Sequence, residues 1–237
     1  MSVKEIEIPS PASAIRGLLG EPEGIGPFPV VVVIHEAFGI DDSMKAQVEK
    51  LTSLGYLAIM PDLFSRGGAR KCLTATFRAL VAQQGQAFED IAAARNFAQK
   101  LPKASEKVGV IGFCMGGSFA LVLAGRGYDV SSVNYGRLPA NLDETLAGAC
   151  PVVASFGSKD KSLPDVANKL ESSLNKNLII HDVKEYEGAG HAFLNPYPAG
   201  PKIMQPVLRR FLGVSPQPEA AADAWKRIDD FFKRFLS

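Results

Sequence analysis

Continuous apolar runs recur along the chain and predict the strands of a central sheet. The runs VVVVI (30–34) and VGVIGF (108–113) lack polar alternation, which is typical of strands buried on both faces of a parallel sheet. The N-terminus differs, because apolar residues at 3–8 alternate with charged ones and predict a half-exposed strand. Further strands are predicted at 56–64, 151–157 and 177–187.

Between these runs, apolar residues recur at the three- and four-residue spacing of a helix. This spacing predicts helices over 44–54 and 86–99, a buried helix opened by GGSFALVLAG (116–125) and a short helix around Leu170. A last helix is predicted from one apolar face formed by Trp225, Ile228, Phe232 and Phe235. Such alternation predicts a single α/β domain over residues 1–237, with a mostly parallel, doubly wound sheet and helices on both faces.

Composition and charge exclude several classes of partner. The 26 basic and 25 acidic residues leave a net charge of +1, which provides neither a basic surface for nucleic acid nor a polybasic membrane patch. The N-terminus has no signal-peptide core, and no apolar run is long enough to cross a bilayer. Cys72, Cys114 and Cys150 show no disulfide or zinc-ligand spacing. We therefore expect a soluble cytoplasmic protein, a monomer or weak homodimer, that needs no cofactor or metal.

The predicted strands deliver chemically useful groups at their carboxyl ends, where open α/β sheets bind their ligands. The strand at 30–34 leads into Glu36, and VGVIGF leads into Cys114. The later strands lead into Asp160 and then His191. A thiol, a carboxylate and an imidazole thus reach one edge of the sheet in the order nucleophile, acid, histidine, which is the order of α/β-hydrolase triads.

The stretch GFCMGG (112–117) favours an exposed, reactive Cys114 over a buried core cysteine. A sharp turn from strand to helix would strain the backbone at Cys114, and glycines at 112 and 116 would relieve the resulting clashes. Gly117 would let the helix pack closely on the sheet. The helix N-terminus favours a thiolate there. A phosphate-binding loop is a poorer interpretation, because the GxGxxG register is absent.

Each remaining candidate has a competing structural interpretation. His191 lies in the glycine-flanked loop GAGHAF (188–193), where a general base would be accessible, whereas His181 lies within a predicted strand. Asp160 in SKDKS is either the orienting acid or a solvated loop charge, with Asp165 as its competitor. Glu36 is either a site residue or an ordinary acid.

Four motifs together resemble the dienelactone hydrolase family, which are cysteine hydrolases of the α/β-hydrolase fold. The motifs are HEAFG (35–39), GFCMGG (112–117), GSKD (157–160) and GAGHAF (188–193), with PDLF (61–64) between the first two. The resemblance covers roughly residues 14–194. It implies hydrolysis of a small-molecule ester or lactone.

The resemblance also implies a role for each matching residue. Cys114 would be the nucleophile, His191 its base and later the acid for the leaving group, and Asp160 would orient the imidazole. Glu36 would contact the resting thiol and exchange partners as substrate binds. The backbone N–H groups of Met115 and Ala37 would form the oxyanion hole.

The chain departs from the family pattern where the substrate is held. Family members that act on dienelactone hold its carboxylate with arginines, one of them four residues after the histidine, where this chain has Asn195. For the other arginine, Arg66, Arg70 and Arg78 are candidates. An amide cannot form a charged carboxylate clamp, so a neutral or differently shaped ester is expected. Candidate lining residues for the acyl pocket are Phe38, Phe64 and Tyr135. Residues 196–218, which are rich in proline, form a predicted surface excursion and a candidate lid.

Two rival functions use the same residues. The Cys-His-Asp site would also suit acyl transfer, which release of free acid without an added acceptor would distinguish from hydrolysis. Alternatively, the fold would be a non-catalytic scaffold that uses Cys114 as a thiol sensor. Cys72 and Cys150 show no sign of acting as a resolving partner for such a sensor.

Overall fold

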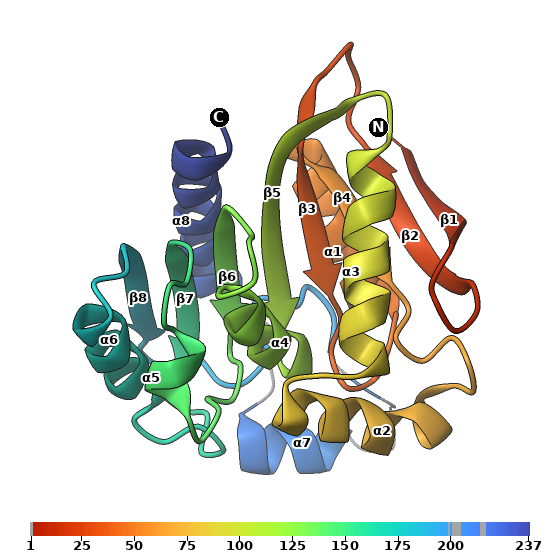
Figure 1. Ribbon diagram of the computed structural model, residues 1–237. Helices are drawn as coiled ribbons and strands as arrows, with labels where there is room; N and C mark the ends of the chain where they lie inside the picture. Colours follow the sequence, from red (N-terminus) through yellow and green to blue (C-terminus); the bar gives the residue numbers. More distant parts are fainter. Residues whose placement is uncertain (1, 199, 201–204, 214–216) are drawn as a thin grey trace.

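The computed structural model describes residues 2–198, 200, 205–213 and 217–237. These residues form an eight-stranded sheet in the order β1-β2-β4-β3-β5-β6-β7-β8 (Figure 1). Antiparallel pairing joins β1 to β2 and β2 to β4, and all the other neighbours are parallel. The strands are β1 (Ser2–Ile8), β2 (Ile15–Glu21), β3 (Phe28–Ile34), β4 (Leu57–Pro61), β5 (Ala104–Phe113), β6 (Val130–Asn134), β7 (Val152–Gly157) and β8 (His181–Tyr186).

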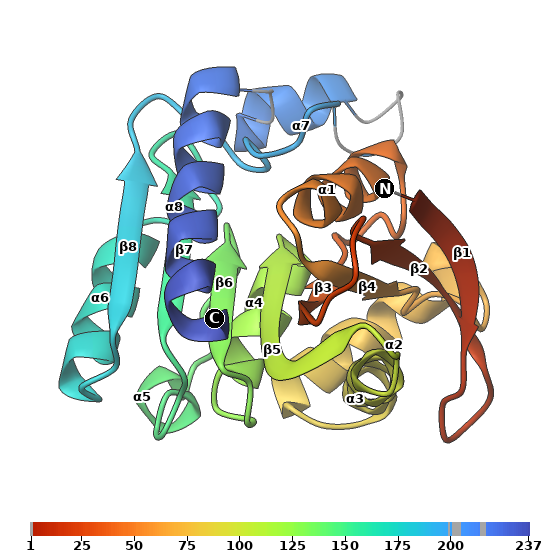
Figure 2. The same ribbon diagram turned by 90° about the horizontal axis from the view of Figure 1, so that it is seen from above.

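Helices cover both faces of the sheet, so the predicted doubly wound architecture is confirmed. In Figure 2, α1 and α8 lie on one face, and α3, α4 and α6 lie on the other. Central strands such as β3 are therefore buried on both faces, which explains their unbroken apolar runs. The helices are α1 (Asp42–Ser53), α2 (Ala69–Ala82), α3 (Gln86–Gln99), α4 (Met115–Leu123), α5 (Leu142–Thr145), α6 (Val166–Lys176), α7 (Gln205–Leu212) and α8 (Pro218–Leu236).

Several elements were not expected, because their apolar patterns are weak. The strand β2 (IRGLLGE) contains two glycines, and β6 (VSSVN) is short and half polar. The buried serines of β6 are satisfied by contacts that are distant in sequence, since the Ser131 hydroxyl donates to the Ala120 carbonyl at 2.9 Å. Helix α2 was also not predicted; Thr76 is its buried residue, and half-buried side chains such as Leu73 and Leu80 pack it against the core.

The strand expected at 177–187 is wrong in its first four residues. Leu178 adopts a left-handed backbone (φ +57°), and Ile179 donates its N–H back to Leu174. These residues therefore end α6, and β8 begins only at His181. A strand cannot pass through a left-handed residue without a break in its ladder.

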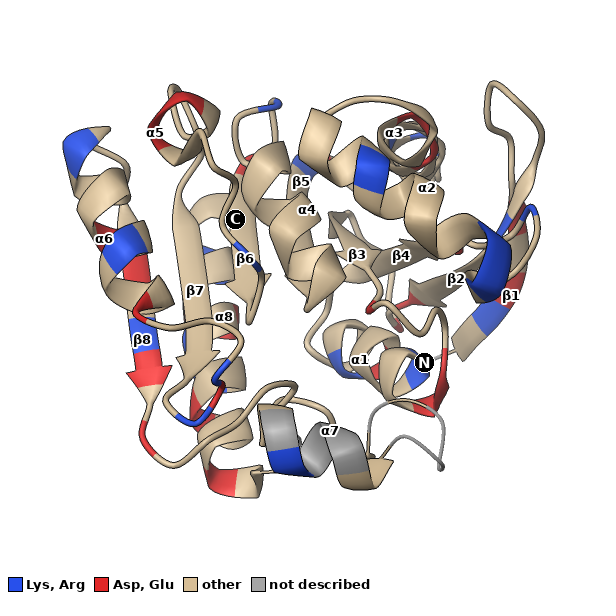
Figure 3. Cartoon of the chain, turned by 90° about the horizontal axis from the view of Figure 1, so that it is seen from below, with Lys and Arg blue, Asp and Glu red and all other residues tan. Residues whose placement is uncertain are grey.

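Two helices lie beyond the carboxyl edge of the parallel strands. Seen from that edge in Figure 3, α2 lies on the side of α3, and α7 lies on the side of α1. The excursion expected at 196–218 therefore contains a helix, α7, and it ends where α8 begins at Pro218. Positions 199, 201–204 and 214–216 of the candidate lid lie outside the described residues. Among the described residues, every helix is too short or too polar to cross a membrane.

Candidate active site

Cys114 lies at the turn between β5 and α4, in a strained backbone conformation. Its φ of +54° and ψ of −114° lie outside the regions that side chains normally allow. The turn is held because the Cys114 N–H donates to the Asn134 carbonyl at 3.0 Å and its carbonyl accepts from Ser118. The side chain is half-buried at the N-terminus of α4. The expected strained turn is confirmed.

The surrounding glycines allow backbone segments to approach more closely than any side chain would permit. A Cβ at Gly112 would lie 1.9 Å from the carbonyl oxygen of Gly116, and one at Gly116 would lie 2.0 Å from that of Ile34. At Gly117 the nearest atom would be the Asn134 carbonyl oxygen at 2.5 Å. The absence of side chains at these positions therefore allows the turn to pack directly against the backbones of β3 and β6.

His191 is a buried imidazole that is bound to a carboxylate on one side. Its Nδ1 lies 2.5 Å from Oδ2 of Asp160, which is 4% exposed. The other carboxylate oxygen, Oδ1, accepts from the N–H and the hydroxyl of Ser162 at 3.0 and 2.6 Å. Burial raises the pKa of Asp160, but the hydrogen bonds from His191 and Ser162 outweigh it and hold that pKa below its usual value.

The second partner of His191 is the Cys114 side chain. Because Asp160 occupies Nδ1, the nitrogen that remains for the sulfur is Nε2. Burial disfavours a charged imidazole, yet the negative charges of Cys114 and Asp160, with their hydrogen bonds, raise the His191 pKa to about 10. The imidazole thus lies between the Asp160 carboxylate and the Cys114 side chain.

Asp165, the competing acid, has other partners. It lies at the start of α6, where its side chain is 55% exposed and accepts a hydrogen bond from Asn168. Its nearest cation is Lys169, one turn further along the helix. The structure therefore brings Asp160, and not Asp165, to the imidazole.

Glu36 is buried at the end of β3 and is held by an amide. Nδ2 of Asn195 donates to Oε1 of Glu36 at 3.0 Å, and the Tyr135 hydroxyl donates to Oδ1 of the same Asn195 amide at 3.4 Å. The family resemblance implied that Glu36 contacts the resting thiol. In this structure the Asn195 amide holds Glu36 instead, and the thiol faces His191.

Burial is the main influence on the Glu36 carboxyl, and it raises the pKa to about 7, although His191 and Asn195 act in the opposite direction. Between pH 4.5 and 7 the folded chain then keeps a proton that the unfolded chain has lost. The contribution of Glu36 to stability therefore falls as the pH rises through this window. A pKa shift of this size lowers the free energy of unfolding at pH values above 7 by on the order of 3 kcal/mol, relative to its value below pH 4.5.

We expect the Glu36→Gln variant to gain stability relative to wild type as the pH rises from 5 to 8, by a few kcal/mol, because its amide stays neutral. Urea unfolding at both pH values measures this change. Glu49→Gln, an exposed change on α1, serves as the control. A constant difference between the Glu36→Gln variant and wild type at the two pH values would contradict this account.

His35 supports the loop after β3 rather than the chemistry. It is fully buried, and its Nε2 accepts from the Leu63 N–H at 3.1 Å, so Nδ1 must carry the proton that is donated to the Glu36 carbonyl. Burial lowers the pKa of His35, which keeps the ring neutral. This bond fixes the backbone that leads into Ala37.

Two further residues near the site have left-handed backbones, Tyr135 (φ +41°) and Ala192 (φ +59°). The Tyr135 ring is fully buried, and its centroid lies 5.1 Å from that of His191. Such conformations are costly for residues with side chains, and they cluster here at the two turns beside the imidazole. Tyr135 is thus a wall of the site.

The other expected substrate contacts divide into buried and exposed groups. Phe64 is buried edge-on against His35, with ring centroids 4.8 Å apart, whereas Phe38 is half-buried beside Gly200. Arg66 is committed to a bidentate ion pair with Asp90 at 2.6 and 3.0 Å. The other two candidate arginines, Arg70 and Arg78, are exposed on α2 and have no ionic partner among the described residues.

The chain after α7 returns to the His191 loop, which the sequence did not indicate. The His191 N–H donates to the carbonyl of Leu212 at 2.9 Å. A Cβ at Gly190 would lie 2.0 Å from the Gly213 carbonyl oxygen, so these two segments are in direct backbone contact. Gly190 and Gly213 are the sequence feature that could have indicated this close backbone contact.

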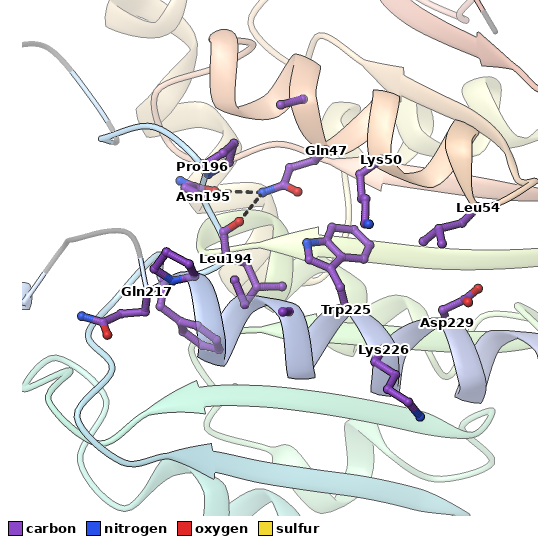
Figure 4. Close-up of a pocket in the computed structure, with 15 residues that line it drawn as sticks. Gln47, Lys50, Leu54, Leu194, Asn195, Pro196, Gln217, Trp225, Lys226 and Asp229 are labelled. Carbon is purple, nitrogen blue, oxygen red and sulfur yellow. Dashed lines mark hydrogen bonds between the residues drawn. The ribbon is translucent and has the colours of Figure 1, made fainter.

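A groove of about 720 Å³ lies between α1 and α8 (Figure 4). Trp225 and Leu194 supply apolar walls, and Gln47 and Asn195 line one end. Gln47 donates to the Leu194 carbonyl at 3.0 Å and to Oδ1 of Asn195 at 3.2 Å. Cys114 and His191 are not among its lining residues. Gln47 thus contacts the residue that holds Glu36, a role that was not predicted from the sequence.

Comparisons with known proteins agree with the motifs. A family model described as the dienelactone hydrolase family matches residues 15–236. A carboxymethylenebutenolidase from Pseudomonas putida is 31% identical over 195 residues, which cover 77% of this chain and 82% of that protein. A carboxymethylenebutenolidase 1 from Cupriavidus pinatubonensis is 28% identical, over 70% of this chain and 75% of that protein.

Solved structures agree on the fold. The dienelactone hydrolase from Anabaena variabilis has a TM-score of 0.73 at 18% identity, covering 100% of this chain and 99% of its own. A dienelactone hydrolase-like promiscuous phosphotriesterase from metagenomic libraries has a TM-score of 0.80 at 22% identity with the same coverage. The fold is therefore that of the α/β-hydrolases.

Proposed function

Because this chain belongs to the dienelactone hydrolase family, we propose that it is a cysteine-dependent hydrolase of small esters or lactones. One observation carries the proposal. The buried His191 bridges the Asp160 carboxylate, at 2.5 Å, and a thiol that is held on a strained turn at a helix N-terminus. This is the arrangement that an activated nucleophile requires.

The first step is attack on the ester carbonyl by the Cys114 thiolate. The sulfur–carbon bond forms as the carbonyl π electrons move onto oxygen. Met115 is the first residue of α4, so its N–H has no partner within the helix and is available to the oxyanion. The N–H of Ala37, in the loop fixed by His35, is the second proposed donor. Each such donor commonly contributes about 3 kcal/mol to the transition state.

The second step is departure of the alcohol. The carbonyl reforms, the carbon–oxygen bond breaks, and His191 transfers its Nε2 proton to the leaving alkoxide. The pKa of His191 is high because the thiolate lies beside it, and forming the thioester removes that charge. The imidazolium therefore becomes a stronger acid at the moment when a proton is needed.

Hydrolysis of the thioester completes the cycle. Neutral His191 removes a proton from water, and the resulting hydroxide attacks the thioester carbonyl. The carbon–sulfur bond then breaks, which releases the carboxylic acid and restores the thiolate–imidazolium pair. Asp160 keeps the imidazole in the tautomer with Nδ1 protonated throughout.

The proposed substrate is a neutral ester or lactone. Asn195 carries an uncharged amide, so it cannot pair with a substrate carboxylate as an arginine would. It is also 3% exposed, and its Nδ2 group already donates to Glu36. Arg66 is paired with Asp90 and is equally unavailable. Among the described residues no lysine or arginine is buried beside Glu36, Asp160 and His191, and such an acid-rich site disfavours an anionic substrate.

We expect the Asn195→Arg variant to raise the ratio of kcat/KM for carboxylate-bearing lactones to that for neutral ones, by about tenfold, because a guanidinium can pair with the carboxylate. Steady-state kinetics on a matched pair of lactones measures this ratio. Asn195→Gln adds length without charge and is the control. A folded Asn195→Arg variant with an unchanged ratio would contradict the proposed substrate class.

Hydrolysis is distinguished from its rivals by its products. We expect stoichiometric release of free acid from a p-nitrophenyl ester when no acceptor alcohol or amine is present, whereas an acyltransferase would stall after one turnover. The sensor alternative is not favoured by the other cysteines. Burial raises the pKa of Cys150 to about 12, and Cys72 makes a hydrogen bond to the Phe64 carbonyl.

A further inference from the structure

Gln47 is a buried amide on the core-facing side of α1. It is 2% exposed, and its helical neighbours Met44, Val48 and Leu51 are all buried in the core. Burying an amide there is costly unless its groups are hydrogen-bonded. The Nε2 group makes two hydrogen bonds, to the Leu194 carbonyl and to Oδ1 of Asn195, at 3.0 and 3.2 Å. Both acceptors follow the His191 loop directly.

These hydrogen bonds have a fixed direction. The Leu194 carbonyl can only accept, so Gln47 must present its NH₂ group to this segment. The same NH₂ group then requires Asn195 to present Oδ1, and Nδ2 of Asn195 is left to face Glu36. The Leu194 carbonyl thus determines the donor-to-acceptor direction of each hydrogen bond in the series from Gln47 on α1, through Asn195, to Glu36 after β3.

We propose that Gln47 is a positioning residue, which locks the Asn195 amide so that Oε1 of Glu36 can only accept a hydrogen bond. Any proton on Glu36 must then reside on Oε2. This inference rests on the proposed function only where it links Glu36 to the reactivity of Cys114. The direction of the hydrogen bonds stands without it.

The lock favours the ionised form of Glu36. The titratable groups facing this carboxyl are His191 after β8, Asp41 at the start of α1 and Tyr135 after β6. Of these, the charged His191 favours ionisation, and Asp41 opposes it. Ionised Glu36 in turn favours the imidazolium, and therefore the Cys114 thiolate that it pairs with.

The Gln47→Glu variant tests this role, because it keeps the size of the side chain but its carboxylate can only accept. Asn195 would then turn Nδ2 toward residue 47 and Oδ1 toward Glu36, which would have to be protonated to donate. We expect the pH midpoint for alkylation of Cys114 by iodoacetamide to rise by about one unit or more. Peptide mass spectrometry separates Cys114 from the other two cysteines, and the assay needs no substrate.

The Gln47→Leu variant provides a second measurement that introduces no charge. Without Gln47, the Oδ1 atom of Asn195 keeps only the Tyr135 hydroxyl as a partner, at 3.4 Å, and a hydroxyl can donate or accept. Asn195 can then adopt either orientation, so protonated Glu36 can donate to Oδ1 of Asn195, which is not possible in wild type. The midpoint should rise again, by less than in Gln47→Glu. Lys50→Gln, an exposed change one turn along α1, should leave it unchanged.

The outcomes separate this inference from the proposed function. Midpoints in the order wild type, Gln47→Leu, Gln47→Glu support the positioning role, even if no ester is hydrolysed. An unchanged midpoint in folded Gln47→Leu would overturn it, even if the enzyme is active. If Gln47→Glu fails to fold, the comparison between Gln47→Leu and wild type decides.

Discussion

The Cys114→Ala variant is expected to lose at least about 10⁴-fold in kcat/KM for p-nitrophenyl esters while keeping its fold. Alanine retains the Cβ that the strained turn already accommodates, so the backbone at φ +54° need not change. What disappears is the proposed nucleophile, which is also the side chain that raises the pKa of His191. Steady-state kinetics and circular dichroism measure the two parts of this prediction.

Cys72→Ala is the matched control, because Cys72 is also a free, half-buried thiol but lies on α2. It should retain nearly full activity. Cys114→Ser should remain far below wild type, since an alcohol is not ionised by this imidazole as a thiol is. Substantial hydrolysis by purified Cys114→Ala would remove Cys114 from the mechanism.

The Gly116→Ala variant is expected to be destabilised by more than about 4 kcal/mol, or to fail to fold. Its Cβ would lie 2.0 Å from the Ile34 carbonyl oxygen and 2.9 Å from that of His35. Both atoms belong to backbone, so no side-chain rotation relieves the clash. Denaturant unfolding measures the change in the free energy of unfolding.

Gly67→Ala is the control for this prediction. The nearest atoms to its added Cβ would be the side-chain carbons of Lys71 at 3.3 Å, and Lys71 is exposed and can move. We expect a change of less than about 1 kcal/mol. Equal stability of the two variants would mean that the turn tolerates a wider separation of α4 from β3 than the structure has.

The parts of the fold that could be predicted from sequence are those with strong local patterns. Unbroken apolar runs identified β3 and β5, and the glycines around Cys114 identified the strained turn, because close backbone approach admits no other residue. The order of Cys114, Asp160 and His191 placed them at one edge of the sheet. The structure agrees for two of them, since Nδ1 of His191 lies 2.5 Å from Oδ2 of Asp160.

The parts that could not be predicted depend on contacts between distant segments. Gln47 reads as an ordinary polar helix residue, and only the folded chain places it against Asn195, which is 148 positions away. The return of the chain after α7 to the His191 loop is likewise a backbone contact, which leaves no apolar pattern. The hydrogen bond from the Asn195 amide to Glu36 likewise joins residues that are 159 positions apart.

The arrangement around His191 has a consequence for substrate choice. The imidazolium is surrounded by Cys114, Asp160 and Glu36, and no free arginine or lysine is buried with them among the described residues. An anionic substrate would add a further negative charge to this cluster. A neutral acyl group avoids that cost, which is why the Asn195→Arg experiment is informative about the natural ester.

The most direct test of the proposed mechanism is capture of the acyl-enzyme. Wild-type protein mixed with p-nitrophenyl acetate and quenched in acid within milliseconds should carry one acetyl group, and peptide mass spectrometry should locate it on Cys114. The label should be absent in Cys114→Ala and should decay on wild type at the rate of acid release. Turnover with the label on another residue, or with no acyl-enzyme under conditions where deacylation is limiting, would contradict the mechanism.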